Sequence, residues 1–118
     1  MRPILVVEDD KTSYMLIKEF LKPLGLDLHH VTDGTEAVNH IKLNPDIRLI
    51  LMDLKLPSID GYEATKIIKQ MNPNICIIAQ TAYALSGDRE KAISAGCDDY
   101  LSKPIDFKKL QELVSKYL

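Results

Sequence analysis

The stretch that decides the fold is Leu49-Ile50-Leu51-Met52-Asp53-Leu54-Lys55-Leu56-Pro57. Four consecutive apolar residues lead into Asp53, and a proline follows four positions later. A short apolar run bounded by turn residues is typical of a strand buried on both faces of a parallel sheet. Asp53 then lies at the carboxyl end of that strand, where open α/β sheets bind their ligands. An aspartate leaving a strand is more often a turn residue or a helix cap, so the role of Asp53 depends on the rest of the chain.

Composition narrows the class of protein. The chain has 118 residues, a net charge of -2 and 46% hydrophobic residues, which predicts one globular domain over residues 1–118. It has no run of Lys or Arg that would indicate nucleic-acid binding. Its apolar runs are shorter than the roughly 18 residues of a membrane span. Cys76 and Cys97 do not form a paired ligand spacing, so we expect a reduced, cytoplasmic chain.

Short apolar runs alternate with segments of helical periodicity five times along the chain. The predicted strands cover residues 4–7, 28–31, 49–53, 75–79 and 99–102, and the helical segments are centred on 17–24, 37–41, 64–71, 86–95 and 107–117. His29 and His30 interrupt the second apolar run, which favours an edge strand. This alternation predicts a parallel sheet with right-handed crossovers and helices on both faces, that is, a three-layer α/β sandwich.

Polar residues end or closely follow four of the predicted strands. They are Glu8-Asp9-Asp10, Asp53, Thr81 and Lys103. Each has an ordinary explanation: acids favour a helix N-terminus, threonine is a turn residue, and most lysines are solvated. In a parallel sheet, however, the carboxyl ends of the strands share one edge. Capping alone does not explain why acids, a hydroxyl and an amine all converge there.

Such a cluster has a definite chemistry. Carboxylates within about 4 Å of one another repel by several kcal/mol at an effective dielectric constant near 20, and a divalent cation removes that cost. Oxygen ligands with room for water suit Mg²⁺ better than Zn²⁺, and Mn²⁺ can substitute for it. Beside such an ion, Asp53 becomes a nucleophile able to accept a phosphoryl group. Thr81 and Lys103 would donate to the phosphoryl oxygens.

Four motifs carry a family resemblance. They are Val6-Val7-Glu8-Asp9-Asp10, Met52-Asp53-Leu54-Lys55-Leu56-Pro57 with Asp60-Gly61, Gln80-Thr81-Ala82, and Asp99-Tyr100-Leu101-Ser102-Lys103-Pro104. Through them the chain resembles the receiver domains of two-component response regulators over essentially its whole length. Residues 80–84, 87–89 and 96–100 look most like receivers attached to hybrid histidine kinases.

The resemblance implies a flavodoxin-like fold with the strand order 2-1-3-4-5. It implies Asp53 as the phosphoacceptor and a metal site formed by Glu8, Asp9, Asp53 and the Lys55 backbone carbonyl. Glu8, which stands where many members have Asp, would act mostly through a bound water. Thr81 and Lys103 would bind the phosphoryl group, and Tyr100 would be an aromatic switch that moves with Thr81. The Lys103–Pro104 bond is expected to be cis.

The resemblance also implies a role in signalling. The domain would be a phosphoacceptor that phosphorylates and dephosphorylates itself, not an enzyme. Its phosphoryl donor would be a phosphohistidine on a histidine kinase or a histidine phosphotransfer domain. The predicted readout surface comprises residues 86–95, 99–102 and 107–117, which would dock a downstream effector. We expect a monomer or a weak dimer linked to phosphorylation, without nucleic-acid or membrane contact.

Two side chains bear on the lifetime of the phosphorylated state. Lys55 and Tyr83 stand two positions after Asp53 and Thr81, where side chains control the access of water. Neither is a carboxylate or amide suited to orienting an attacking water. Tyr83 would exclude solvent, and Lys55 would offer the phosphoryl group a charge-assisted contact. The sequence therefore predicts a long-lived phosphoaspartate.

Three other classes of protein fit less well. A haloacid-dehalogenase-type phosphatase needs a second aspartate two residues after the nucleophile, where this chain has Lys55. A flavodoxin-like cofactor carrier needs, after its first strand, a loop that binds the phosphate of the cofactor. In this chain the acids at 8–10 stand there and would repel that phosphate. A degenerate receiver used only for docking would not keep all of the key side chains. His29, His30 and His40 are expected to be inert.

Overall fold

A parallel sheet forms the centre of the molecule. The computed structural model describes residues 2–81 and 88–118. Within them the sheet has five strands in the order β2-β1-β3-β4-β5, all pairing in parallel. The strands are β1 (Pro3–Val7), β2 (Asp27–Val31), β3 (Leu49–Asp53), β4 (Cys76–Thr81) and β5 (Asp99–Ser102). This order confirms the predicted fold class, and β2 is the edge strand that the two histidines indicated.

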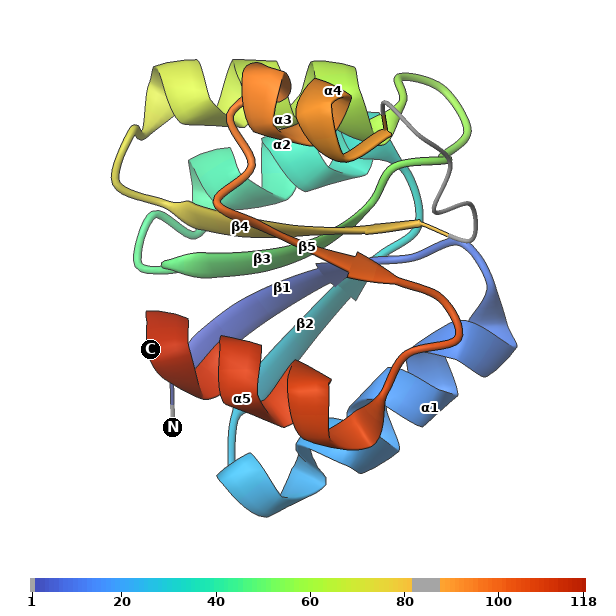
Figure 1. Ribbon diagram of the computed structural model, residues 1–118. Coiled ribbons are helices and arrows are strands. Elements are labelled where there is room, and N and C mark those ends of the chain that lie inside the picture. The colour runs from blue at the N-terminus through green and yellow to red at the C-terminus, as the bar shows by residue number, and fades with distance from the viewer. Residues whose placement is uncertain (1, 82–87) are drawn as a thin grey trace.

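Helices cover both faces of this sheet (Figure 1). One face carries α1 (Lys11–Leu21), followed by the short 3-10 helix η1 (Lys22–Leu24), and α5 (Phe107–Tyr117). The other face carries α2 (Gly34–Leu43), α3 (Gly61–Met71) and α4 (Asp88–Ala95). The result is the predicted three-layer sandwich. Among the residues described, none of these helices combines the length and apolar character needed to cross a membrane.

Successive strand residues contribute to two separate cores, because side chains alternate between the faces of a sheet. Val7, Met52 and Ala79 belong to the core beneath α2, α3 and α4. Val6, Leu51 and Ile78 belong to the core beneath α1 and α5. The same alternation assigns a face of the sheet to each polar residue at the ends of these strands.

Strand β4 is longer than the sequence predicted. The predicted strand ended at Ala79, but β4 continues through Gln80 to Thr81. The prediction failed because Gln80 is polar, whereas the ladder depends on backbone groups: Asp53 and Gln80 are register partners, as are Gln80 and Leu101. Thr81 is therefore the last residue of the strand. The start of α4 predicted at Ser86 lies outside the described residues.

Aspartates begin four of the helices. The side chains of Asp10, Asp33, Asp60 and Asp106 each accept a hydrogen bond from a backbone N–H in the first turn of α1, α2, α3 and α5, respectively. This is the capping that satisfies otherwise unpaired amide donors at a helix start. Asp60 thereby fixes the start of α3, immediately after the loop that follows Asp53.

Two glycines hold that loop in place. A Cβ atom on Gly61 would lie 2.3 Å from the Asp53 backbone oxygen and 2.6 Å from the Leu54 Cα atom. A Cβ atom on Gly34 would lie 2.3 Å from the Ile59 backbone oxygen. The Gly61 amide also donates to the Leu54 carbonyl oxygen at 3.1 Å. The loop from Leu54 to Asp60 thus packs against two helix starts at distances that only glycine allows.

We predict that Gly61→Ala destabilises the protein by about 1–3 kcal/mol, because the added methyl group overlaps backbone atoms that cannot move aside. Ordinarily, replacing a helical glycine by alanine stabilises a helix by roughly 0.5–1 kcal/mol. The sign of the change in the free energy of unfolding therefore shows whether the close approach at Gly61 exists. Urea unfolding of the two proteins measures it, and an alanine variant as stable as the wild type would contradict the close approach.

Candidate functional site

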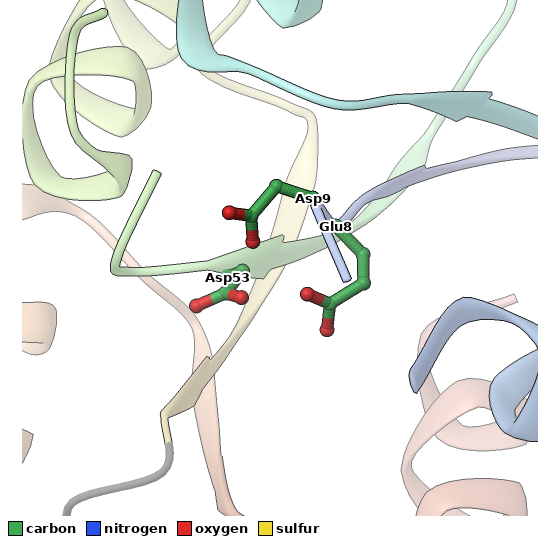
Figure 2. Close-up of side chains that lie close together, drawn as sticks. All are labelled: Glu8, Asp9 and Asp53. Atoms are coloured by element: carbon green, nitrogen blue, oxygen red, sulfur yellow. The ribbon is translucent and has the colours of Figure 1, made fainter. Parts of the chain in front are cut away.

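Three carboxylates meet at the carboxyl edge of the sheet. One oxygen from each of Glu8, Asp9 and Asp53 lies within 4.8 Å of the others, and Figure 2 shows these groups gathered at the end of β3. Strand β1 lies next to β3, with Val7 and Met52 in register, so the residues that follow are neighbours. Glu8 and Asp53 are buried, whereas Asp9 is exposed. The cluster is therefore anchored in the protein and open on one side.

Lys103, the residue directly after β5, contacts this cluster. Its ammonium donates to Glu8 Oε1 at 2.7 Å and to Asp53 Oδ2 at 3.3 Å. Its backbone N–H donates to the Thr81 carbonyl oxygen at 2.7 Å, which ties the ends of β4 and β5 together. The Lys103–Pro104 peptide bond is cis, as expected. Three of the four polar groups that follow strands thus make one connected site.

The electrostatics of the site reflect its burial. Burial raises the pKa of Glu8 to about 7; the hydrogen bond and the charge of Asp53 add to the rise, and the Lys103 hydrogen bond opposes it. For Lys103, burial alone would lower the pKa. The hydrogen bond to Glu8 and the charges of Asp53 and Glu8 outweigh burial and raise that pKa. Burial is thus the main cause of the raised pKa of Glu8.

The residues present fit a hard divalent cation. All three side chains offer carboxylate oxygens, the ligands that Mg²⁺ and similar ions prefer. The exposed side at Asp9 leaves room for water ligands. The Lys55 backbone N–H donates to Asp53 Oδ1 at 3.0 Å, so the loop after β3 folds back over the cluster. The predicted role of the Lys55 carbonyl as a ligand stays a prediction.

Asp10, by contrast, has the ordinary role of a cap. Its carboxylate accepts from the Thr12 backbone N–H at 3.3 Å and from the Ser13 hydroxyl at 2.7 Å. The Ser13 hydrogen bond lowers the pKa of Asp10 below its usual value. Of the three consecutive acids, two therefore build the cluster and the third begins α1.

Thr81 and Tyr100 lie on the other face of the sheet from Asp53. Thr81 is buried. It lies two residues after Ala79, which belongs to the core beneath α2, α3 and α4, so both side chains are on the same face of the sheet. Tyr100 is half-buried and packs against the same core. Their shared face suits a coupled movement, but the switch itself and the contact of Thr81 with a phosphoryl group stay predictions. Lys55 is exposed, and Tyr83 lies outside the described residues, so their effect on lifetime also stays a prediction.

Two residues near the site were missed by the sequence analysis. The His30 ring shares a hydrogen bond with the Glu8 backbone oxygen, at 2.8 Å, and stacks on Tyr14 with ring centroids 3.6 Å apart. His30, which we expected to be inert, thus supports the chain just before Asp9. Gln80 is buried beside Asp53 in the sheet. The signal for His30 was present, because it is a polar residue inside a predicted strand, whereas Gln80 directly follows the strand predicted over residues 75–79.

We predict that Lys103→Met destabilises the metal-free protein by about 3 kcal/mol, because it leaves buried carboxylates without their cation. Asp53→Asn removes one of the crowded charges, so the double variant should lose less stability than Lys103→Met alone. Urea unfolding in EDTA measures all three variants. A double variant as destabilised as the sum of the two single changes would contradict the ion pair.

Comparison with known proteins gives a consistent result. The model of the family "Response regulator receiver domain" matches residues 4–115. The polar-differentiation response regulator DivK of Brucella anthropi is 34% identical over 120 residues, which cover 99% of this chain and 96% of DivK. Hybrid signal transduction histidine kinase I of Dictyostelium discoideum is 40% identical over 95% of this chain. The chain spans only 7% of the length of that kinase.

Two solved structures are similar over nearly the whole chain. The receiver domain of sensor histidine kinase PA1611 from Pseudomonas aeruginosa, with a magnesium ion in its active site cleft, has a TM-score of 0.90 and 39% identity, covering 98% of this chain and 96% of that one. The receiver domain of Ssk1 from Saccharomyces cerevisiae was solved with the histidine phosphotransfer protein Ypd1. It has a TM-score of 0.88 and 31% identity, and the match covers 98% of this chain and 87% of that one. With its fold, its acidic cluster and these relatives, the chain belongs to the receiver domain family of response regulators.

Proposed function

We propose that Asp53 accepts a phosphoryl group from a phosphohistidine in a Mg²⁺-dependent reaction. The observation that carries this proposal is the setting of Asp53: a buried carboxylate that shares the Lys103 ammonium with Glu8 and lies beside Asp9. The role is that of a phosphoacceptor and not of an enzyme with turnover on a separate substrate. The phosphoryl donor is a histidine kinase or a histidine phosphotransfer protein. The similarity to the Ssk1 receiver solved with Ypd1 supports such a partner.

Glu8, Asp9 and Asp53 would hold the Mg²⁺ ion, with the Lys55 backbone carbonyl as a further ligand. The oxygen-only donor set supports this assignment, as does the magnesium ion in the PA1611 receiver. When bound, the ion neutralises charge on the carboxylates and on the transferring phosphoryl group. Mn²⁺, which takes the same kind of oxygen ligands, can substitute.

In the transfer step, a carboxylate oxygen of Asp53 forms a bond to phosphorus while the bond from phosphorus to the histidine nitrogen breaks. The imidazole leaves and takes up a proton. Lys103 already lies 3.3 Å from an Asp53 oxygen, so its ammonium is placed to hold a phosphoryl oxygen. Thr81, at the end of β4, would supply a second donor through its hydroxyl.

We predict that Asp53→Asn abolishes the gain of phosphate mass when the protein is incubated with acetyl phosphate and Mg²⁺, because the amide is a far weaker nucleophile than the carboxylate. Chelating Mg²⁺ with EDTA should stop the gain in the wild type. Intact-mass measurement reads both results.

Asp106→Asn is a matched control for this experiment. Asp106 is exposed and caps α5, and asparagine caps a helix as well as aspartate does. The control should be phosphorylated at the wild-type yield. Phosphate mass on the Asp53→Asn variant at that same yield would contradict the assignment.

We further propose that phosphorylation is read out on the surface formed by α4, β5 and α5, where a downstream effector docks. Three observations support this surface. Tyr100 packs on the same face of the sheet as Thr81. Ile93 on α4 is 47% exposed. The Tyr117 hydroxyl of α5 donates to Asp99 Oδ2 at 3.0 Å, so α5 is tied to β5 next to Tyr100. A shift of Thr81 toward the phosphoryl group would free space that Tyr100 fills.

Amide exchange with and without beryllofluoride, a phosphoryl analogue, tests this surface. We predict that the largest changes in protection fall in α4, β5 and α5, because two states that differ by only a few kcal/mol are enough for such a shift. Asp53→Asn, which cannot hold the analogue in the same way, should show none of these changes. Changes restricted to α1 and α2 would contradict the proposed surface.

A further inference from the structure

Gln80 is a buried polar side chain without a hydrogen-bond partner. It is 1% exposed, and neither its Oε1 nor its Nε2 atom is paired within residues 2–81 and 88–118. A buried amide left unpaired is unfavourable, and most such groups in proteins are paired. An apolar residue would fill the same space in β4 without that cost. The carboxamide of Gln80 is thus available for a partner that the resting arrangement does not give it.

The position of Gln80 in the sheet places its side chain on the face that carries Asp53. Gln80 follows Ile78 by two residues, as Asp53 follows Leu51 and Lys103 follows Leu101. Those three apolar residues belong to one core, beneath α1 and α5. Gln80 therefore leaves the sheet on the same face as Asp53, its register partner on β3. Strand β4, which carries Gln80, lies between β3, which ends at Asp53, and β5, which ends just before Lys103.

Lys103 is the group in this row whose partners must change during the reaction. An ammonium has three N–H donors and no acceptor. Two of its hydrogen bonds now go to Glu8 and Asp53. The carboxylates that accept these hydrogen bonds are the ones that the proposed function assigns to the cation and to the phosphoryl group. Lys103 is only 19% exposed, so water cannot easily replace the lost acceptors.

We propose that Gln80 is a positioning residue for phosphoryl transfer, and that its carboxamide bridges Lys103 and Asp53 once the cation engages Glu8. The side-chain oxygen accepts from the Lys103 ammonium, and the amide N–H donates to an Asp53 oxygen. This bridge satisfies both unpaired atoms of Gln80. It also keeps the ammonium beside Asp53 after its contact with Glu8 is lost. The inference rests on the proposed function of Asp53.

Gln80→Met is the variant that tests the bridge, because methionine has a similar shape and forms no comparable hydrogen bond. In EDTA the variant should melt at the wild-type temperature or above it, since it removes buried unpaired polar atoms. With Mg²⁺ present, its affinity for beryllofluoride should fall about tenfold, the effect of losing a hydrogen bond to a charged group. In the wild type, the NMR signals of the Gln80 side-chain amide and the Lys103 ammonium should both shift on adding the analogue.

Ile78→Val is the matched control. Ile78 lies two residues earlier on the same strand and the same face, so the substitution loosens packing without touching a polar atom. It should lower the melting temperature and leave the affinity for beryllofluoride unchanged. A purely structural role for Gln80 would give that same pattern in Gln80→Met.

Two results would overturn the inference. The first is wild-type affinity for beryllofluoride in Gln80→Met. The second is a lower melting temperature of that variant in EDTA, which would mean that the amide is already satisfied in the resting protein, for instance by a buried water. If the wild type itself bound no beryllofluoride, the proposed function of Asp53 would fail, and the bridge with it.

Discussion

The sharing of one ammonium by two buried carboxylates is the constraint on which the site depends. Lys103 contacts Glu8 and Asp53, residues that lie 95 and 50 positions away in the sequence. Removing charges from water is costly, and the cost is offset only when the charges are closely paired. The three strands β1, β3 and β5 must therefore end at the same level for the site to form. A slip in the register of any of them would bury a charge without its partner.

The strand order explains which residue type each strand supplies. Because β1 and β3 are adjacent, short acidic side chains at their ends already meet. Strand β5 is separated from β3 by β4, and neighbouring strands lie about 4.8 Å apart. Only a long side chain reaches across that distance, and the long flexible amine of Lys103 does so. The same geometry leaves β4 in the middle, where Gln80 lies on the face of the acids and Thr81 on the opposite face.

The sequence was sufficient to predict the strands, their parallel pairing and the convergence of Glu8, Asp9, Asp53 and Lys103, because buried strands have a clear apolar pattern. The residue pattern alone was not sufficient to separate Asp10 from its neighbours, although the family resemblance implied only Glu8 and Asp9 of these consecutive acids as metal ligands. Whether an acid caps a helix or joins a metal site depends on where the strand ends, and consecutive acids give no sign of that. The end of β4 was misplaced for a related reason. Polarity indicates exposure on average, but Gln80 is polar and buried.

The residues of the proposed phosphorylation switch lie on both faces of the sheet. Glu8, Asp53 and Lys103 occupy the face of α1 and α5, while Thr81 and Tyr100 occupy the face of α2, α3 and α4. In the proposed switch, a signal would therefore pass from one face of the sheet to the other. The hydrogen bond from the Lys103 backbone N–H to the Thr81 carbonyl oxygen, at 2.7 Å, is a direct connection between the two faces. In the proposed mechanism, a displacement of Lys103 toward the phosphoryl group would act through this hydrogen bond on the backbone of Thr81. The proposed chemistry and the proposed response would thus lie close together, because the ends of the neighbouring strands β4 and β5 carry Thr81 and lead to Lys103.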